Sequence, residues 1–547
     1  MLLQTSWYPE RYADRDIWRQ DIAAMQDMGI QAVRLGEFAW MDMEPEAGVF
    51  AWDWLDNAMD MLHAAGLMAI LCTPTACPPV WLTQAHPDIL PVNASGQRMV
   101  HGKRQHRCYE SAAYLKACKR ISRQLTLRYG RHPALFAWQI DNELGGERQH
   151  CYCDTCARAY RDYLRDIYGT VEQLNRRWGT QFWAQTYQGF DQIEPPMDID
   201  MQLRNPHNPS HVQTYWRFQS DAIVRFTRSQ AEILRENSDV PVTTNTDTFF
   251  YGDTVDVFAL FESLDVAAID IYTDSPQELS FYCDIMRAVK PGRPIWIMEY
   301  GVKSPRLSAD MQDARLRGAE LFGLFKLRAF HAGQEQGQDG LLSLTGHPLP
   351  AYGLARQYSL QYNRCPAQMP QYPIGFIFDF ASAWSHAVTS RHIGPKRHGY
   401  SRHLLHDVYP AAYSLAGGAR CVRTAEDTSG LAVLLAADLS VHDERWEAVL
   451  RAHLKGGGLL IADTNLFRRN QDNVFLTQPP AFYTQALGLG DYVEPRAADQ
   501  VAYACSVGLG RVILLSPEAP VDIWTAMASM GLLTRKNEGE SICAFMA

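Results

Sequence analysis

The chain lacks any apolar stretch long enough to cross a membrane. Its 547 residues are 47% apolar, yet no run reaches the ~18 residues that suggest a transmembrane helix. The first residues, Met1-Leu2-Leu3-Gln4-Thr5-Ser6-Trp7, have neither the basic start nor the apolar core of a signal peptide. We therefore expect no membrane span and place the protein in the cytoplasm.

Basic residues and cysteines are also sparse. Lys and Arg number 51 against 61 Asp and Glu, which gives a net charge of −10 without long runs of one sign. Proteins that bind the phosphate backbone of nucleic acids need a basic surface, so nucleic acid is not expected as a partner. The 12 cysteines are too few for a disulfide scaffold, and their uneven clustering suggests a cytosolic protein with one metal site.

Several catalytic motifs are missing as well. The sequence has no serine-centred nucleophile elbow, no G-x-G-x-x-G and no H-E-x-x-H. Gly456-Gly457-Gly458 joins an expected helix to an expected strand. A phosphate-binding loop runs from strand to glycines to helix, so we interpret these glycines as a plain turn.

Most of the chain alternates between short apolar runs and helical patterns. Strands are predicted near Leu3, at 31–36, 68–73, 134–140, 241–245, 266–271, 294–298 and near 320–326. Helical patterns lie between them, including 54–65, 111–129 and 153–168. Such alternation is typical of parallel strands with crossover helices, and about eight units predict an α/β fold, the (β/α)8 TIM barrel. We assign the barrel to residues 1–368.

A proline-rich break near 366–373 precedes a second alternating segment. Strands are expected at 374–379, 431–438, 459–463 and 511–516, with helices at 400–415 and 443–454. The pattern predicts a smaller α/β domain of flavodoxin or amidotransferase type over 369–520. A C-terminal tail at 521–547 would follow it.

Two glutamates stand at the ends of expected barrel strands. Glu143 follows the run 137–142, and Glu299 follows the run 294–298. A carboxylate at the C-terminal end of a barrel strand is typical of an active site, because the βα loops gather at that face. Two carboxylates facing one cleft supply the acid and the nucleophile or base that glycosidic bond hydrolysis needs. Ordinary surface glutamates are the alternative.

Arg34 lies inside the strand expected at 31–36. A charged side chain is costly in such a position unless it is paired. We expect it to point into the cleft towards a carboxylate, and a purely structural ion pair is the alternative.

Four cysteines could hold a metal ion. They are Cys108, Cys151, Cys153 and Cys156. Tetrahedral coordination by four thiolates favours zinc in a closed, structural role. Unpaired loop cysteines are the alternative, and His106 or His150 could replace one ligand. Because this segment follows Glu143, a metal here would brace the catalytic loop and take no part in the chemistry.

Longer stretches around these residues carry specific patterns. They are Trp7-Tyr8-Pro9-Glu10, Arg34-Leu35-Gly36-Glu37-Phe38-Ala39-Trp40, Thr73-Pro74-Thr75-Ala76-Cys77-Pro78-Pro79-Val80-Trp81-Leu82, Trp138-Gln139-Ile140-Asp141-Asn142-Glu143 and Trp178-Gly179-Thr180-Gln181-Phe182-Trp183. In these stretches the chain resembles glycoside hydrolase family 42, the bacterial β-galactosidases. The likeness is dense over about 6–200, looser to about 345 and faint beyond.

The resemblance implies a retaining, exo-acting β-glycosidase that hydrolyses terminal β-galactosyl residues of oligosaccharides or glycosides. Glu143 would be the acid/base and Glu299 the nucleophile. The residues that would contact the nucleophile or the sugar are Arg34, Asn142, Tyr272 and Glu335.

The resemblance also bears on metal content and assembly. It implies that the four cysteines match zinc ligands found in some members, with no cofactor needed for catalysis. It implies that 369–520 is a trimerisation domain, so a homotrimer is expected. The family's small C-terminal β domain would be absent or cut short.

The chain departs from the family pattern at positions expected around the sugar subsite. Tyr300 stands in place of a usual Gln, and 302–305 in place of a loop with a Trp platform. Thr273 replaces a proline, and Gln338 or Asp339 replaces a histidine. Specificity for β-glucose, β-mannose, β-fucose or α-L-arabinopyranose therefore stays open. A non-catalytic sugar-binding protein is the alternative of a different class.

Overall fold

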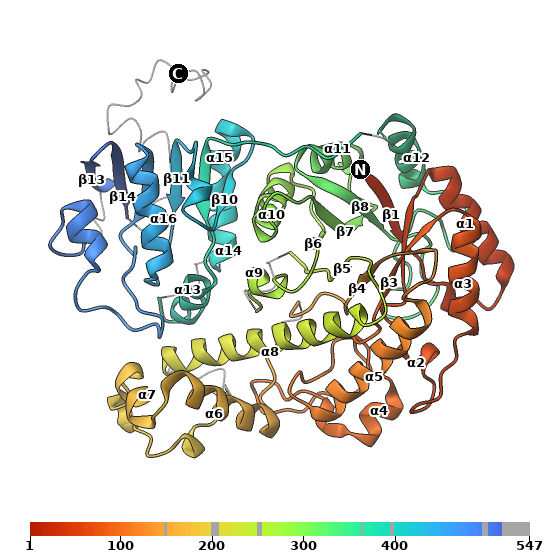
Figure 1. The fold of residues 1–547 in the computed structure, drawn as a ribbon, viewed down its shortest axis with the longest axis horizontal. Coiled ribbons are helices and arrows are strands. Elements are labelled where there is room, and N and C mark those ends of the chain that lie inside the picture. Colours follow the sequence, from red (N-terminus) through yellow and green to blue (C-terminus); the bar gives the residue numbers. More distant parts are fainter. Residues whose placement is uncertain are drawn as a thin grey trace.

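The computed structural model of the protein describes residues 1–146, 150–197, 207–248, 254–362, 365–393, 399–494 and 501–516. Two sheets lie side by side, each with helices around it (Figure 1). No helix in these ranges combines the length and the apolar character that a membrane span requires. The tail predicted at 521–547 lies outside the described residues.

Eight parallel strands form the first sheet, in the order β5-β4-β3-β2-β1-β8-β7-β6. They are β1 (Leu2–Ser6), β2 (Ala32–Leu35), β3 (Met68–Cys72), β4 (Leu135–Gln139), β5 (Val242–Thr243), β6 (Ala267–Ile271), β7 (Ile295–Gly301) and β8 (Ala319–Phe325). The short β5 is joined to β6 by backbone hydrogen bonds from Asp265 to Val242 and from Asp270 to Thr246, at 2.9 and 2.8 Å. The predicted (β/α)8 TIM barrel is confirmed.

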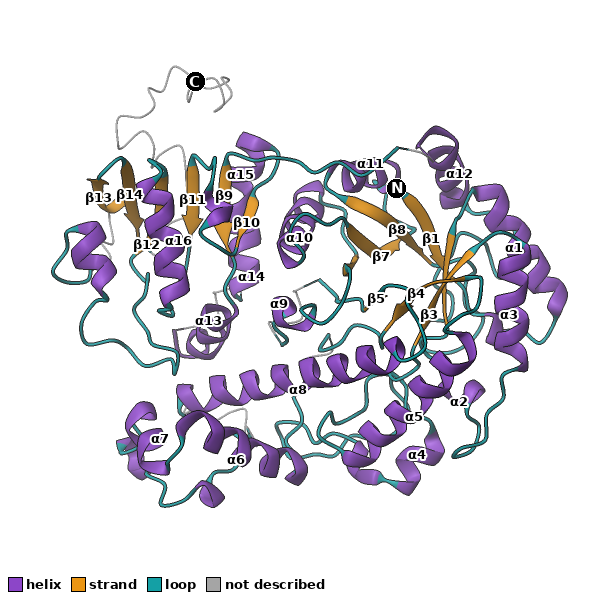
Figure 2. Cartoon of the chain, in the orientation of Figure 1, coloured by secondary structure: helices purple, strands orange, loops and turns teal. Residues whose placement is uncertain are grey.

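Helices cover the outside of the barrel (Figure 2). The helices of this part of the chain are α1 (Arg15–Met28), α2 (Trp40–Met43), α3 (Asp53–Ala64), α4 (Val80–Ala85), α5 (Ala112–Tyr129), α6 (Asp154–Tyr168), α7 (Val171–Trp178), α8 (Pro209–Arg235), α9 (Val257–Leu260), α10 (Pro276–Val289), α11 (Leu307–Leu316) and α12 (Pro350–Tyr362). Of these, α6 and α7 lie on the far side of α8 from the barrel (Figure 2). α1 shows how the sequence fixes their ends. The Asp14 side chain accepts from the Asp16 amide at its start, and Gly29 ends it at φ 72°, where a side chain would be strained.

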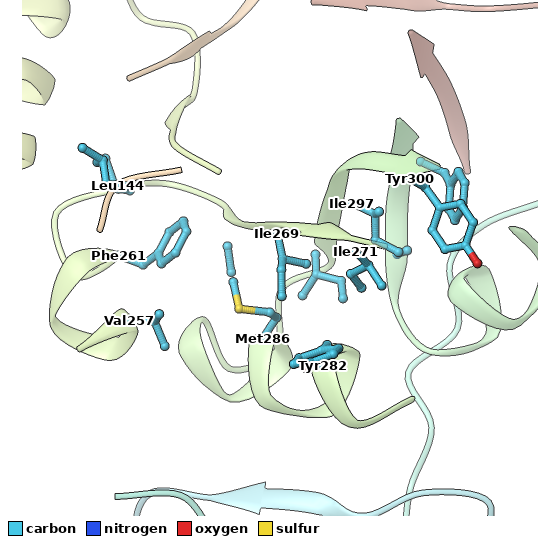
Figure 3. Packing of buried hydrophobic residues seen from close by; sticks show 14 of the residues in the cluster. Leu144, Val257, Phe261, Ile269, Ile271, Tyr282, Met286, Ile297 and Tyr300 are labelled. Atoms are coloured by element: carbon cyan, nitrogen blue, oxygen red, sulfur yellow. The ribbon is translucent and has the colours of Figure 1, made fainter. Parts of the chain in front are cut away.

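Alternate residues of the barrel strands face two different cores. Ile269 and Ile271 of β6 and Ile297 of β7 belong to the outer core, where Tyr282 and Met286 of α10 meet them (Figure 3). The inner core consists of Ala32, Ile70, Ala137, Ala268, Trp296, Met298 and Leu321. Residues beyond this inner layer, at the C-terminal ends of the strands, are therefore the ones that can form a site.

The second sheet has the order β10-β9-β11-β12-β14-β13. Its strands are β9 (Ile374–Ile377), β10 (Arg420–Val422), β11 (Val433–Ala436), β12 (Leu459–Asp463), β13 (Val501–Val507) and β14 (Gly510–Leu515), and its helices are α13 (Phe380–Ile393), α14 (Tyr400–His403), α15 (Tyr409–Ala416) and α16 (Glu444–Lys455). Only β13 is antiparallel to its neighbour. The parallel part follows the doubly wound order of flavodoxin-like folds, so the predicted smaller α/β domain is confirmed.

Buried carboxylates tie the second sheet to the barrel. Asp284 of α10 accepts the Ala419 amide at 2.8 Å and the Tyr409 hydroxyl. Asp472 accepts from Tyr168 of α6 and pairs with Arg177 of α7, both at 2.7 Å. These contacts hold the second α/β unit against α6, α7 and α10.

Candidate active site

Glu143 lies in the loop after β4, and this loop has an unusual backbone. Asp141 and Glu143 have φ values of 57° and 47°, in the left-handed region that non-glycine residues rarely adopt. The Gln105 amide donates to the carbonyls of Asn142 and Glu143, both at 3.0 Å. Asn245, two residues after β5, accepts the Glu143 backbone amide at 3.1 Å. These contacts hold a conformation that the chain alone would not favour.

The side chain and backbone of Asp141 anchor the same loop to neighbouring residues. Its carboxylate is fully buried and accepts from Arg107 and from the Thr75 hydroxyl, both at 2.6 Å. Its amide donates to Thr73 at 2.9 Å. Burial raises the pKa of the Asp141 carboxyl, although Arg107 and Thr75 oppose the shift. Asp141 therefore has a structural role in this loop. Glu143 is the residue of the loop whose carboxyl group faces the site.

Glu299 lies inside β7, not past its end. The strand was predicted at 294–298, whereas β7 continues to Gly301. Its pairing with β8 is irregular between Ile297 and Tyr300. Such an irregularity breaks the in-and-out alternation of a strand. As a result Glu299, which pairs with the buried Arg34, lies on the interior side together with Met298, and Tyr300 points outward (Figure 3).

The structure brings three of the predicted site residues to the two glutamates. Arg34 of β2 is fully buried and forms an ion pair with Glu299. It also donates to Asn142 Oδ1 at 2.5 Å. Tyr272, just after β6, donates its hydroxyl to the other Glu299 oxygen at 2.5 Å. Asn142 in turn donates to Glu143 Oε2 at 3.3 Å, so one network connects both glutamates.

The two glutamates are close enough for one substrate atom to lie between them. Carboxylate oxygens of Glu143, Asp270 and Glu299 all lie within 4.8 Å of one another. Glu143 also pairs with Arg104 at 2.9 Å. We did not identify Asp270 or Arg104 from the sequence. Asp270 carries the same signal as Arg34, a charge inside an apolar strand run, whereas Arg104 lies in a loop without any pattern that marks it.

A cavity of about 650 Å³ opens next to this centre. Arg104 lines it, as do Phe38, Phe330 and Glu335. Glu335 lies in the loop after β8 and is 3.6 Å from the buried Lys326 ammonium. Burial lowers the pKa of Lys326 to about 8, although Glu335 opposes the shift. Glu335 is thus placed at the cavity wall, beside Lys326.

Three of the departures from the family pattern now have positions. Tyr300 is fully buried outside the barrel and donates to Asp310 of α11 at 2.5 Å. Our expectation that it lies at the sugar subsite is therefore wrong, because the irregularity in β7 turns it outward. Lys303 and Asp339 form an ion pair at 3.1 Å that links the loops after β7 and β8. Both side chains are exposed, so the pair contributes little to stability.

The four cysteines form a compact buried cluster. Their sulfur atoms all lie within 4.8 Å of one another. Cys108 Sγ is 3.8 Å from Cys153 Sγ and 3.4 Å from Cys156 Sγ. A zinc ion with Zn–S distances of about 2.3 Å gives tetrahedron edges of about 3.8 Å. The donor set and spacing fit zinc, and none of the described cysteines forms a disulfide.

Comparisons with known proteins agree on one family. A family model described as β-galactosidase, Glyco_hydro_42, matches residues 6–350. The curated β-galactosidase Bga of Halorubrum lacusprofundi is 33% identical over 496 residues, which cover 84% of this chain and 69% of that protein. The β-galactosidase BgaA of a Thermus species is 35% identical over 421 residues, which cover 71% of this chain and 64% of that protein.

The fold agrees as well. The solved structure of the polyextremophilic β-galactosidase from the Antarctic haloarchaeon Halorubrum lacusprofundi matches with a TM-score of 0.87 and 28% identity. The match covers 97% of this chain and 89% of that chain. The alignments with the two curated relatives span only about two thirds of those proteins' length.

Proposed function

The chain belongs to the β-galactosidase family Glyco_hydro_42 and is a glycoside hydrolase, and on this premise we propose that it is a retaining exo-β-glycosidase that releases terminal β-D-galactosyl residues. The relatives named above are β-galactosidases. The observation that carries the proposal is the approach of Glu143 to Glu299.

Their spacing supports retention over inversion. Carboxyl groups about 5–5.5 Å apart are typical of retaining enzymes, whereas inverting enzymes separate them by about 6.5–9.5 Å to admit a water molecule. The closest oxygens of Glu143 and Glu299 lie within 4.8 Å. A direct attack on the sugar by one of the two is favoured by this distance.

In the first step, a Glu299 oxygen attacks the anomeric carbon while Glu143 gives its proton to the leaving oxygen. The bond to the aglycone breaks and a glycosyl ester on Glu299 forms. In the second step, Glu143 takes a proton from water, which attacks the same carbon and frees Glu299. Two inversions leave the product with its original configuration.

Arg34 and Tyr272 prepare Glu299 for this attack. Both donate to its carboxylate, which favours the ionised form and fixes the direction of the oxygens. The Asn142 oxygen accepts from Arg34, so the Asn142 amide nitrogen, which donates to Glu143, is the end that faces the sugar. There it can donate to the 2-hydroxyl, a contact that strengthens in the transition state. Glu335 at the cavity wall would bind other sugar hydroxyls.

Galactose is the proposed sugar, and the changed positions 302–305, 273 and 338–339 make other sugars the rival hypothesis. Nitrophenyl β-D-galactoside, glucoside, mannoside and fucoside, and the α-L-arabinopyranoside, should be compared by kcat/KM. The first product should be followed by proton NMR before mutarotation. The proposal requires the galactoside to be hydrolysed best and the β-anomer to appear first.

We also propose that the cluster of Cys108, Cys151, Cys153 and Cys156 holds a structural zinc ion. The sulfur distances support four-coordinate binding, which leaves no position for substrate. Cys156 belongs to α6 and the other three to loops. Bound zinc would therefore fix the segment after Glu143 to α6.

A homotrimer in the cytoplasm is the proposed state of the protein. The second α/β domain contains no catalytic group of the site described above, which is consistent with a role in assembly. The absence of disulfides among the described cysteines is consistent with a reducing compartment. Sedimentation equilibrium tests the assembly, because a mass that stays at one chain at all concentrations would contradict it.

A further inference from the structure

A third carboxyl group, that of Asp270, lies in the catalytic centre. It belongs to β6, and its register partner on β7 is Glu299. Its neighbours Ile269 and Ile271 face α10 (Figure 3), so the Asp270 side chain faces the barrel interior. One of its oxygens lies within 4.8 Å of oxygens of both Glu143 and Glu299.

The side chain that hydrogen-bonds to Asp270 is neutral, whereas Glu143 and Glu299 are each paired with an arginine. Arg34 pairs with Glu299, and Arg104 pairs with Glu143. Asp270 Oδ2 accepts from the Asn245 amide at 2.5 Å. Its Oδ1 is buried and has no hydrogen-bond partner among the described residues. A negative charge at this position would be desolvated and would face two other carboxylates.

The surroundings of Asp270 on balance favour its protonated form. Burial and the charges of Glu299 and Glu143 raise the pKa of Asp270 well above its usual range, while Arg34 opposes the shift. The Tyr272 hydroxyl, which donates to Glu299, is a further titratable group near Asp270. Geometry and electrostatics therefore agree on a carboxyl group that keeps its proton.

Asn245 connects Asp270 to the residue expected to hold the sugar. Its amide nitrogen also donates to Asn142 Oδ1 at 2.8 Å. Its oxygen accepts from Gln139 at 3.0 Å and from the Glu143 amide at 3.1 Å. These four contacts allow only one orientation of the Asn245 amide. With Asn142 Oδ1 occupied, the Asn142 amide nitrogen is left to point at Glu143 and the substrate.

We propose that Asp270 is a positioning residue that stays protonated in the working enzyme and, through Asn245, fixes the orientation of the Asn142 amide. The neutral carboxyl accepts from Asn245 without placing another negative charge beside the Glu299 carboxylate. A charge there would favour protonation of Glu299 and weaken it as a nucleophile. This inference rests on the proposed function of the same site.

Two substitutions separate the neutral role from a charged one. Asp270→Asn keeps an oxygen for Asn245 and a donor at the other position, so kcat/KM on nitrophenyl β-galactoside should stay within about tenfold of wild type. Asp270→Ala removes the acceptor, and kcat should fall about a hundredfold with little change in KM. On the 2-deoxygalactoside, which lacks the hydroxyl that Asn142 holds, Asp270→Ala should lose far less. Asp270→Asn that is as inactive as Asp270→Ala would overturn the inference.

A spectroscopic test measures the charge without relying on activity. The infrared spectrum of Asp270→Asn should be subtracted from that of the wild type at neutral pH. The difference should contain a carboxylic-acid C=O band. Asp239→Asn, at an exposed site before β5, is the control and should remove an ionised carboxylate band instead. A carboxylate band from Asp270 would refute the protonated state.

A failure of the proposed function and a failure of this inference would give different results. A wild-type protein inactive on every aryl glycoside would contradict the proposed function, and the infrared difference would still decide the charge of Asp270. An active wild type with a carboxylate band at Asp270 would contradict only the inference.

Discussion

Arg34 and Glu299 form an ion pair inside the barrel, between strands that are not neighbours. β1 and β8 lie between β2 and β7 in the sheet. The Arg34 side chain is fully buried and that of Glu299 is 7% exposed. Because the guanidinium also holds Asn142, it connects the proposed nucleophile to the loop of the proposed acid.

Replacing Arg34 should affect rate and stability together. Arg34→Met leaves Glu299 without its cation and Asn142 Oδ1 with only one of its two donors, so kcat should fall about 10²–10³-fold. Breaking a buried pair on one side should also cost about 3–5 kcal/mol of unfolding free energy. Steady-state kinetics and urea unfolding measure the two effects.

Arg34→Lys is the matched control, since it keeps the charge but cannot reach both partners as a planar guanidinium does. It should recover most of the stability and only part of the rate. Full activity of Arg34→Met would show that Arg34 is not needed to orient the nucleophile.

The strands and helices of the barrel could be predicted from the sequence because their patterns are local. The runs at 68–73 and 134–140 correspond to β3 (Met68–Cys72) and β4 (Leu135–Gln139). The strand predicted at 241–245 is observed only over Val242–Thr243. Asn245 lies beyond it, and its side chain binds residues of the site such as Asn142. β13 was not predicted at all, and it pairs only with β14 at the sheet edge.

The parts of the site that depend on register could not be predicted. If the side chains of β7 alternated regularly from Trp296, Glu299 would point outward as Ile297 does. The register irregularity between Ile297 and Tyr300 turns Glu299 toward the barrel interior instead. No residue type in the strand marks that irregularity. Asp270 was overlooked for a different reason. Its charge inside an apolar run was visible, but its partner Asn245 is distant in sequence.

Glu299→Gln and Glu143→Gln should fail in different ways. Glu299→Gln removes the covalent step, so turnover should be lost on every substrate. Glu143→Gln removes only the proton for the leaving group. It should keep appreciable glycosylation with activated aryl glycosides and lose it with natural ones. Pre-steady-state release of nitrophenol measures the first step directly.

Azide supplies the control for these roles. It should restore activity to Glu143→Ala, because an anionic nucleophile needs no general base to attack the glycosyl ester, and the product should be the β-azide. An α-azide from Glu143→Ala, or full activity of Glu299→Gln, would show that the two roles are reversed or that the site is wrong.

Removing the metal ligands should lower stability more than rate. Cys156→Ser should abolish zinc binding, measured by atomic emission, and should lower Tm while the initial rate of freshly folded enzyme stays near wild type. Chelation of the wild type should do the same. Cys365→Ser, at a half-buried thiol outside the cluster, should change neither. Absence of zinc in protein purified without chelator would contradict the metal site.

His211 of α8 should make the protein less stable in mild acid. Its ring is stacked between those of Tyr160 and Trp178, with centroids 5.8 and 5.1 Å away, and burial lowers its pKa to about 3. An unfolded histidine titrates near pH ~6.5, so between pH ~6.5 and ~3 the unfolded chain binds more protons than the folded chain. As the pH is lowered through this range, the free energy of unfolding decreases by up to about 1.4 kcal/mol per pH unit. His211→Phe keeps the stacking and removes this loss, which amounts to about 2 kcal/mol by pH ~5. Urea unfolding of both proteins at neutral and mildly acidic pH measures it, with exposed His347→Phe as control. Equal acid sensitivity of wild type and His211→Phe would show that other groups govern the loss of stability.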